Sequence, residues 1–363
     1  MQFPVRLTAR RNPGPIVWLS PLFALALTVL FGAALFALLG KNPLQALYVF
    51  LIAPLETLRG WGEVGVKMTP LLLCAAGLVV CFRANVWNIG AEGQFLAGAI
   101  AGGWVALLCP QGVGHWYLVI VLLAGMAGGA FWGAITALLR DRFNANEILV
   151  SLMLVYIAQF LLAYCVQGPL QDPEGLGFPQ SALFASSASI PVLIGGTRLH
   201  LGFVLAVAAA LIIQVMMTRM FIGFQFRVSG MAPLAAKYAG FHPKRLLWTS
   251  MLISGALAGL AGVAEVSGPV GQLTLNISPG YGFAAIIVAF VGRLSPAGCI
   301  PAAFVMALFY LGGELGQSRL GLPSSITGVY QGMLLFFLLI CDSLIYFKPV
   351  WQGFGGRKTN SEA

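Results

Sequence analysis

The chain has 363 residues, 59% of them hydrophobic and 9% charged, with a mean hydropathy of +0.90 and a net charge of +9. Soluble domains carry about a quarter charged residues, so this composition excludes a soluble enzyme or binding module. Apolar runs of about 20 residues recur, and the alternating ten-residue segments of membrane β-barrels are absent, which predicts an all-α, polytopic membrane helix bundle.

Ten spans follow from the apolar runs, and they form one membrane domain over residues 16–347, with cytoplasmic tails at 1–15 and 348–363. The expected spans are 16–39, 69–82, 85–108, 117–139, 148–166, 200–218, 246–266, 281–291, 297–316 and 326–347. The first run is too long for a signal-peptide core and lacks a clear cleavage site, so we expect it to be retained. Residues 44–55 are too short to cross and are expected at the outer interface or as a re-entrant segment.

The charge distribution indicates an orientation in the membrane, although a net charge of +9 would suggest a nucleic-acid partner in a soluble protein. If the N-terminal tail is cytoplasmic and every run crosses once, only five of the 20 lysines and arginines lie outside. These five are Lys41, Arg59, Lys67, Arg198 and Arg319. This positive-inside bias predicts cytoplasmic termini, contact with membrane lipid and no nucleic-acid partner.

Two spans contain glycine-interrupted, polar stretches, one in each half of the chain. They are NIGAEGQFLAG, starting at Asn88, and SPGYGFAAIIVAF, starting at Ser278. Unwound backbone inside a membrane is tolerated where it is buried or lines a cavity, and paired interruptions are typical of a transported ligand's site. Glycine also serves close helix packing, and packing is our interpretation for the GxxxG spacings at 98–102, 125–129 and 255–259.

Two long connections differ from the other loops. Residues 167–199 form the expected outer loop, which is either a surface for an extracytoplasmic protein or an unstructured connection. Residues 219–245 are basic and water-facing, and Pro233 and Gly240 predict a helix from Pro233 to Tyr238 that ends at Gly240. This helix is either a handle for a cytoplasmic partner or part of a loop that only fixes orientation.

No chemistry of an enzyme is evident in the residue pattern. The six cysteines have no CxxC spacing and are interpreted as packing residues, and the three histidines lack metal-ligand spacing. No nucleophile and base pair and no GxxxxGK[ST] phosphate loop occur in the chain. We therefore expect no metal, no cofactor and no catalytic residue.

Four stretches give the chain a family resemblance. They are PLLLCAAGLVVCFRANVWNIGAEGQFLAG, NANEILVSLMLVYIA, RVSGMAPLAAKYAGFHPKRLLWTSMLISGALAGLAG and SPGYGFAAIIVAFVGRLSPAG, spread over residues 70–298. With them the chain resembles permease subunits of bacterial ABC importers, in the nucleoside branch related to ribose-type and branched-chain amino acid permeases. The resemblance implies that residues 231–240 are the coupling helix that docks on an ATP-binding subunit. Its expected contact residues are Met231, Pro233, Ala236, Lys237, Tyr238 and Gly240.

Three positions depart from the family pattern. Ala232 stands where relatives usually have Asn, which forfeits an N-cap side chain worth about 1 kcal/mol. Val155 replaces a common Asn, which leaves the exact ligand open. Asn85 stands where relatives often have Gly, and Asn tolerates the left-handed backbone expected there.

The expected substrate pathway combines polar and aromatic residues. Asn88, Glu92 and Gln94 are costly inside a membrane unless they face a cavity or have partners, so they either line the pathway or, for Glu92, cap a broken helix. Trp87, Tyr281 and Phe283 could hold a flat base, although ordinary packing explains them equally well. Ser151 matches the related pattern, and so does Glu147, which could instead sit at its helix N-terminus.

The sequence thus predicts the transmembrane subunit of an importer for nucleosides in a bacterial plasma (inner) membrane. The expected partners are an ATP-binding subunit, a second permease subunit, identical or homologous, and an extracytoplasmic solute-binding protein. Two alternatives stay open: an ABC permease for a simple sugar or amino acid, and a stand-alone ion-coupled secondary transporter. The isolated acids Glu265, Glu314 and Asp342 would serve the last alternative, but no proton-relay partners are evident.

Overall fold

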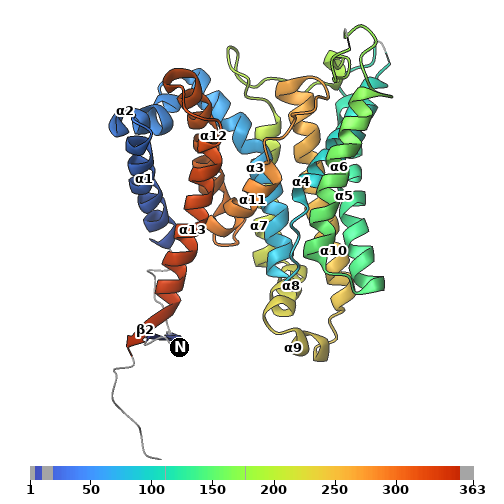
Figure 1. Cartoon of the computed structure of the whole chain (residues 1–363). Helices are drawn as coiled ribbons and strands as arrows, with labels where there is room; N and C mark the ends of the chain where they lie inside the picture. Colours follow the sequence, from blue (N-terminus) through green and yellow to red (C-terminus); the bar gives the residue numbers. More distant parts are fainter. Residues whose placement is uncertain (1–4, 10–18, 111, 176, 352–363) are drawn as a thin grey trace, which may run out of the picture. The chain divides into compact units, whose positions relative to one another are not determined.

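A computed structural model describes residues 5–9, 19–110, 112–175 and 177–351 of the chain. The described chain is nearly all helical, as predicted (Figure 1). Eight of its helices are long and apolar enough to cross a membrane, and two expected spans, at α4 and α11, are shorter helices. All ten expected spans therefore correspond to helices, namely α1, α3, α4, α5, α6, α7, α10, α11, α12 and α13.

The chain divides into two compact units, which we call the terminal unit and the main unit. The terminal unit comprises Met1–Leu47 and Gly328–Ala363. It contains α1 (Ser20–Leu38), α2 (Pro43–Leu47) and most of α13 (Ile326–Tyr346), and Gly32 of α1 lies directly against the ring of Tyr330. Two short strands, β1 (Val5–Ala9) and β2 (Phe347–Trp351), pair antiparallel within the expected tails. Most of both tails lies outside the described residues.

The main unit, Tyr48–Thr327, is built around α3 (Leu58–Arg83), which is buried along almost its whole length. Helices α7 (Gly202–Arg219), α10 (Pro243–Glu265), α11 (Tyr281–Val291) and α12 (Cys299–Leu320) pack against it. The expected span at 69–82 was too short, because α3 already begins at Leu58. The side chain of Thr57 caps this start by accepting the Gly60 N–H at 3.0 Å. Ion pairs explain the polar first turns, since Lys67 meets Glu314 at 2.9 Å and Glu63 meets Arg198 at 3.4 Å.

Glycines allow α4 (Ala91–Leu107), α5 (Tyr117–Phe143) and α10 to approach one another closely. A Cβ at Gly98 would overlap the backbone of Gly259, and one at Gly129 would overlap Gly255. The packing role predicted for the GxxxG spacings is thus confirmed, because backbones at this distance leave no room for a side chain. Helix α6 (Glu147–Gln167) also packs on α4.

The two long connections lie at opposite ends of the main unit (Figure 1). The connection at residues 167–199 is not unstructured, because it contains the 3-10 turn η4 (Ser186–Ala188). It also bonds to the segment after α10, with Ser181 N–H donating to Leu273 O and Ile190 N–H donating to Ser267 O. That segment begins with the π-turn η5 (Val266–Val270), and the short apolar stretch before α3 forms η2 (Tyr48–Ile52) and η3 (Ala53–Leu55).

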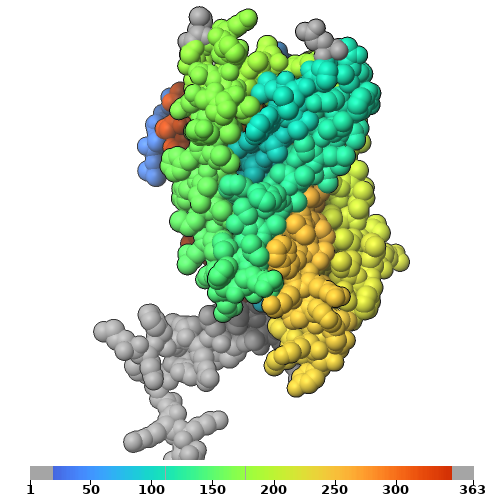
Figure 2. Space-filling view, turned by 90° about the vertical axis from the view of Figure 1, so that its right-hand side faces the viewer, coloured from blue at the N-terminus to red at the C-terminus, as the bar shows by residue number. Residues whose placement is uncertain are grey.

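The basic connection contains more structure than expected. Besides α9 (Pro233–Tyr238), which matches the predicted helix, it forms α8 (Phe221–Met231), which the sequence analysis treated as a water-facing loop. Gly223 permits the tight turn into α8, because a Cβ there would overlap the backbone of Met216 and Met217. In Figure 2 the yellow to orange surface around α9 protrudes beyond the green helices.

Candidate functional site

The first interrupted span enters the bundle as non-helical backbone. After α3 ends, residues 84–90 lack regular helix, and Asn85 adopts a left-handed conformation with φ of 56°, as the sequence predicts. Asn88 organises this segment: its Oδ1 accepts the Gly90 N–H at 3.0 Å, and its Nδ2 donates to Ser254 Oγ at 3.0 Å. Asn88 and Gln94 also bond to each other twice, at 3.0 and 3.2 Å. Both side chains are buried, and their partners account for the burial.

In the second interrupted span, too, a polar side chain accepts backbone N–H groups just before the helix begins, and the two spans are in contact. Gly280, with φ of 93°, precedes α11, and the Ser278 hydroxyl accepts the Gly280 and Tyr281 N–H groups at 3.1 and 3.0 Å. The Gly282 N–H then donates to Glu92 Oε2 of α4 at 2.6 Å. A Cβ at Gly282 would overlap the Glu92 backbone, so the first turns of α4 and α11 touch.

Glu92 therefore stands where two helix N-termini meet. Their orphan N–H groups and dipoles favour negative charge, which makes a carboxylate a suitable cap. With 2% of its surface exposed, Glu92 has no room for solute in this conformation. The capping alternative for Glu92 describes the geometry seen here.

Ser151 of α6 contacts the non-helical segment that leads into α4. Its hydroxyl accepts the Ile89 N–H at 3.2 Å, and its Cβ lies so close to Gly90 that a side chain there would crowd it. Val155, one turn further along α6, is buried and lies against Gly93. An amide side chain at position 155 would be buried and would need a hydrogen-bond partner between α4 and α6. Valine needs none, which gives a physical reason for the apolar residue.

The three aromatic candidates do not form one group. Tyr281 is buried and packs against Tyr310 and Phe95, with ring centroids 5.4 and 6.2 Å away. Trp87 and Phe283 are partly exposed, at 40% and 37%. A single aromatic clamp is therefore absent from the described conformation.

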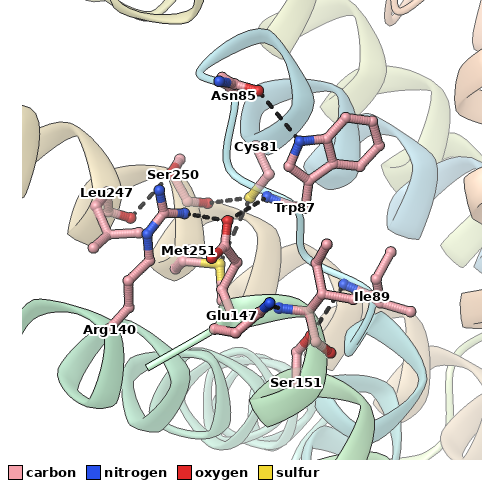
Figure 3. Close-up of polar contacts among 12 residues, drawn as sticks. Cys81, Asn85, Trp87, Ile89, Arg140, Glu147, Ser151, Leu247, Ser250 and Met251 are labelled. Atoms are coloured by element: carbon pink, nitrogen blue, oxygen red, sulfur yellow. Dashed lines mark hydrogen bonds and ion pairs between the residues drawn. The ribbon is translucent and has the colours of Figure 1, made fainter. Parts of the chain in front are cut away.

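Trp87 lies in the non-helical segment after α3, beside Asn85 and Glu147 (Figure 3). Its ring stacks on Phe290, and its indole N–H donates to Asn85 Oδ1 at 3.2 Å. The Trp87 N–H approaches Glu147 Oε1 at 3.5 Å, and this carboxylate also pairs with Arg140 of α5. Glu147 thus ties α5 and α6 to the non-helical segment, as well as beginning α6.

A second ion pair, which the sequence analysis missed, lies beside α9. Lys244 Nζ of α10 lies 2.7 Å from Asp141 Oδ1 of α5, and Trp248 Nε1 donates to Asp141 Oδ2 at 3.2 Å. A cavity of about 310 Å³ opens here, with Asn85, Arg140, Asp141, Pro233 and Lys244 among its lining residues. In the sequence, the only sign of this pair is that Asp141 and Lys244, which have opposite charges, lie near the ends of two different spans.

One side of helix α9 is buried against the protein, and the other side is exposed. Ala236 is fully buried, and Gly240, with φ of 79°, lets the Phe241 N–H bond back to Ala236 O at 3.0 Å. In contrast, Leu234 and Tyr238 of α9 and Met231 at the end of α8 are at least 77% exposed. Large apolar side chains that gather on a surface are typical of protein interfaces.

These features agree with the comparisons to known proteins. Residues 60–341 match the family model described as branched-chain amino acid transport system / permease component. The chain belongs to this permease family. Permeases of this family are transport subunits, and the chain is a multi-pass membrane protein.

Several relatives cover most of the permease. It is 32% identical to a glucose ABC transporter permease protein of Haloferax volcanii, over 100% of this chain and 97% of the relative. It is 31% identical to a nucleoside ABC transporter permease protein of Lactococcus lactis, over 89% and 90%, and 31% identical to a guanosine ABC transporter permease protein of Bacillus subtilis, over 76% and 80%. An inward-facing structure of a putative metal-chelate type ABC transporter matches 88% of the chain and 98% of that structure's chain, with a TM-score of 0.46 and 16% identity.

Proposed function

We propose that this permease forms one half of the pathway of an ATP-driven importer for nucleosides. The observation that carries the proposal is the meeting of α4 and α11 N-termini at Glu92, deep in the main unit. Relatives named as nucleoside and guanosine permeases support the choice of substrate. The functional partners are an ATP-binding subunit, a second permease subunit and an extracytoplasmic solute-binding protein.

The pathway residues serve as partners for each other until substrate replaces them. When α4 and α11 separate, Glu92 and the Gly282 N–H lose their mutual hydrogen bond. Asn88 and Gln94, which bond to each other at the start of α4, would exchange these bonds for bonds to substrate. A sugar with several hydroxyl groups offers both donors and acceptors for these groups. Substrate then favours the separated state only by the difference between its affinities for the two states.

Helix α9 is the proposed docking element for the ATP-binding subunit. Its exposed face would enter a groove of that subunit, while two connections transmit the movement into the membrane. Phe241 contacts Phe221 and Phe224 of α8, with centroids 5.9 and 6.2 Å apart, and the Lys244–Asp141 pair connects the start of α10 to the end of α5.

A glucose-type substrate is the second candidate, because the glucose permease relative is similar over the whole chain. The same amide and carboxylate groups suit a hexose, whereas a nucleoside base also needs an aromatic or apolar face, which Trp87 or Phe283 would supply. Uptake of labelled guanosine and of labelled glucose, measured in parallel in proteoliposomes that contain the complete transporter, distinguishes the two. Uptake of guanosine and not of glucose supports the nucleoside, whereas uptake of glucose and not of guanosine contradicts it.

The membrane orientation is also part of the proposal. The positive-inside bias places α9 and both termini in the cytoplasm and the loop at 167–199 on the outer side of a bacterial plasma membrane. Cysteine substitutions at the exposed residues Ser186 and Lys237, made in a chain whose native cysteines are replaced and labelled in intact cells with an impermeant maleimide, test this arrangement. Labelling at position 237 but not at 186 would reverse it.

A further inference from the structure

A second polar cavity lies at the α9 end of the main unit, apart from the proposed pathway. It has a volume of about 50 Å³ and is enclosed by the ends of α3 and α7, by α8 and by the loop between α11 and α12. The polar residues around it are Arg83, Arg227, Gln214, Thr218 and Ser295. Every polar side chain in this lining is either cationic or neutral.

The two arginines lack a negative partner. Within the described residues neither Arg83 nor Arg227 forms an ion pair, while the nearby acids Asp141 and Glu147 are already paired with Lys244 and Arg140. Arg83 donates one hydrogen bond, from Nε to Leu294 O at 2.9 Å. Arg227 Nε is buried without any hydrogen-bond partner in the described chain. Both guanidinium groups line the same small cavity, so their like charges repel each other.

The loop that closes the cavity has an uncommon backbone. Arg293 and Leu294 have successive φ values of 58° and 50°, a left-handed conformation that costs energy for residues other than glycine. This conformation directs the Leu294 carbonyl to Arg83 and places the Ser295 hydroxyl beside Gln214 Oε1 at 3.2 Å. Gln214 Oε1 also accepts the Ala297 N–H at 3.2 Å, so the amide oxygen is used and its NH₂ group remains a donor near the cavity.

We propose that this cavity binds a phosphate group, with the Arg83 and Arg227 guanidinium groups as its principal ligands. Guanidinium offers paired N–H donors that match phosphate oxygens, and the anion would relieve the repulsion between the two cations. The phosphate belongs either to an anionic phospholipid or to a free anion. The lipid source has additional support: Leu211 and Val215 are exposed and share a helical face with Thr218, so acyl chains could lie along α7.

The bound phosphate would also fix α8 in place. Gly230 of α8 lies against the Arg83 carbonyl so closely that a Cβ there would overlap it. Arg227 on the same helix and Arg83 on α3 would then share one anion, which joins the two helices immediately before α9. Occupancy of the cavity is therefore expected to stabilise the protein.

Lipid binding to the purified full-length chain tests the proposal. The chain is placed in nanodiscs of phosphatidylcholine alone or with phosphatidylglycerol, and lipid retention is counted by native mass spectrometry. We expect one retained phosphatidylglycerol per chain, and about tenfold weaker retention in Arg227→Gln and Arg83→Gln, as expected for loss of a charged hydrogen bond. Arg245→Gln is the control, because it removes the same charge from an exposed residue at the same end of the unit.

A second arm separates the two sources of phosphate. Inorganic phosphate is added to the phosphatidylcholine nanodiscs, and the unfolding midpoint is measured. A midpoint that rises with phosphate in the wild type but not in Arg227→Gln assigns the site to a free anion, whereas a rise with phosphatidylglycerol alone assigns it to lipid. If Arg227→Gln does not fold, Arg227→Lys replaces it, because lysine keeps the positive charge but lacks the paired N–H donors of guanidinium. We expect this variant to retain an intermediate amount of phosphatidylglycerol. Equal retention and equal midpoints in the cavity variants and Arg245→Gln would overturn the proposal.

Discussion

Single residues decide how the two interrupted spans are held together. Glu92 and Gly282 are separated by 190 positions in the chain, yet the carboxylate of one accepts the N–H of the other. The sequence predicted both interruptions and the polar residues in them. It could not predict that they touch, because this contact depends on how α4 and α11 pack and no local pattern records it.

Replacement of Glu92 tests the capping geometry. In Glu92→Ala the Gly282 N–H loses its acceptor in a buried site, so we expect the free energy of unfolding to fall by about 1–3 kcal/mol and uptake to be lost or altered. Glu92→Gln keeps an acceptor oxygen and should recover most of the stability. Glu56→Gln is the surface control. Uptake kinetics and thermal midpoints measured side by side would contradict the proposed role if Glu92→Ala matched the wild type in both.

His200, which precedes the start of α7 at Gly202 and so lies just outside the span, is expected to give the protein a pH-dependent stability. Burial, and then the positive charge of Arg198, lower the pKa of His200 from 6.5 to about 4. Between these values the unfolded chain binds a proton that the folded chain does not, so stability falls as pH decreases through this window. The largest expected loss is about 3 kcal/mol, since one pKa unit corresponds to about 1.4 kcal/mol.

The variant His200→Asn isolates this effect. Asn can still accept the Gly202 N–H that now bonds to Nδ1 at 3.2 Å, but it does not titrate. Unfolding midpoints recorded from neutral to acidic pH should decline less steeply in His200→Asn than in wild type. His242→Asn, at an exposed histidine, should retain the wild-type slope, and identical slopes in all three proteins would rule out His200 as the cause.

At the level of helices, glycine positions determine which elements can approach. Gly259 of α10 lies so close to α5 that a Cβ would overlap the Gly125 carbonyl, whereas a Cβ at Gly328 of α13 has nothing within 4 Å. We expect Gly259→Ala to destabilise the protein by about 1–3 kcal/mol and Gly328→Ala to leave it unchanged or slightly more stable. Chemical denaturation in detergent measures both, and equal midpoints would show that α5 and α10 can separate at little cost.

Helix α9 carries the prediction for coupling. Gly240→Pro is incompatible with the observed φ of 79° and removes the N–H that bonds to Lys237 O, and Lys237→Glu reverses a charge on the proposed docking surface. Both variants should insert normally but lose most ATP-driven uptake. Lys41→Glu makes the same charge change on an exposed residue outside α9 and should transport normally. Wild-type uptake by both α9 variants would remove the coupling assignment.

The elements that the sequence predicted have local signals, and those that it missed depend on distant partners. Pro233 and Gly240 bound α9, and glycine with polar residues marks the starts of α4 and α11. The early start of α3 was missed because Lys67 looks unsuited to a span until Glu314, far along the chain, neutralises it. Helix α8 was missed because its basic residue favoured a loop.

At the level of the whole molecule, the two ends of the main unit differ in structure. The main unit places a structured loop at one end and the exposed face of α9 at the other, with the α4 and α11 junction between them. The chain belongs to a permease family and contains no phosphate loop, which agrees with the proposed docking of α9 on a separate subunit. The energy for transport is expected to enter through α9 from a separate ATP-binding subunit.

The most direct test is uptake by proteoliposomes that contain either this permease alone or the permease with its ATP-binding and second permease subunits. The solute-binding protein and labelled uridine are supplied outside, and ATP or an ion gradient is supplied in turn. We expect uridine to accumulate only with the complete complex and ATP, and we expect this accumulation to be insensitive to ionophores. Accumulation by the permease alone, driven by an ion gradient and abolished by an ionophore, would contradict this expectation.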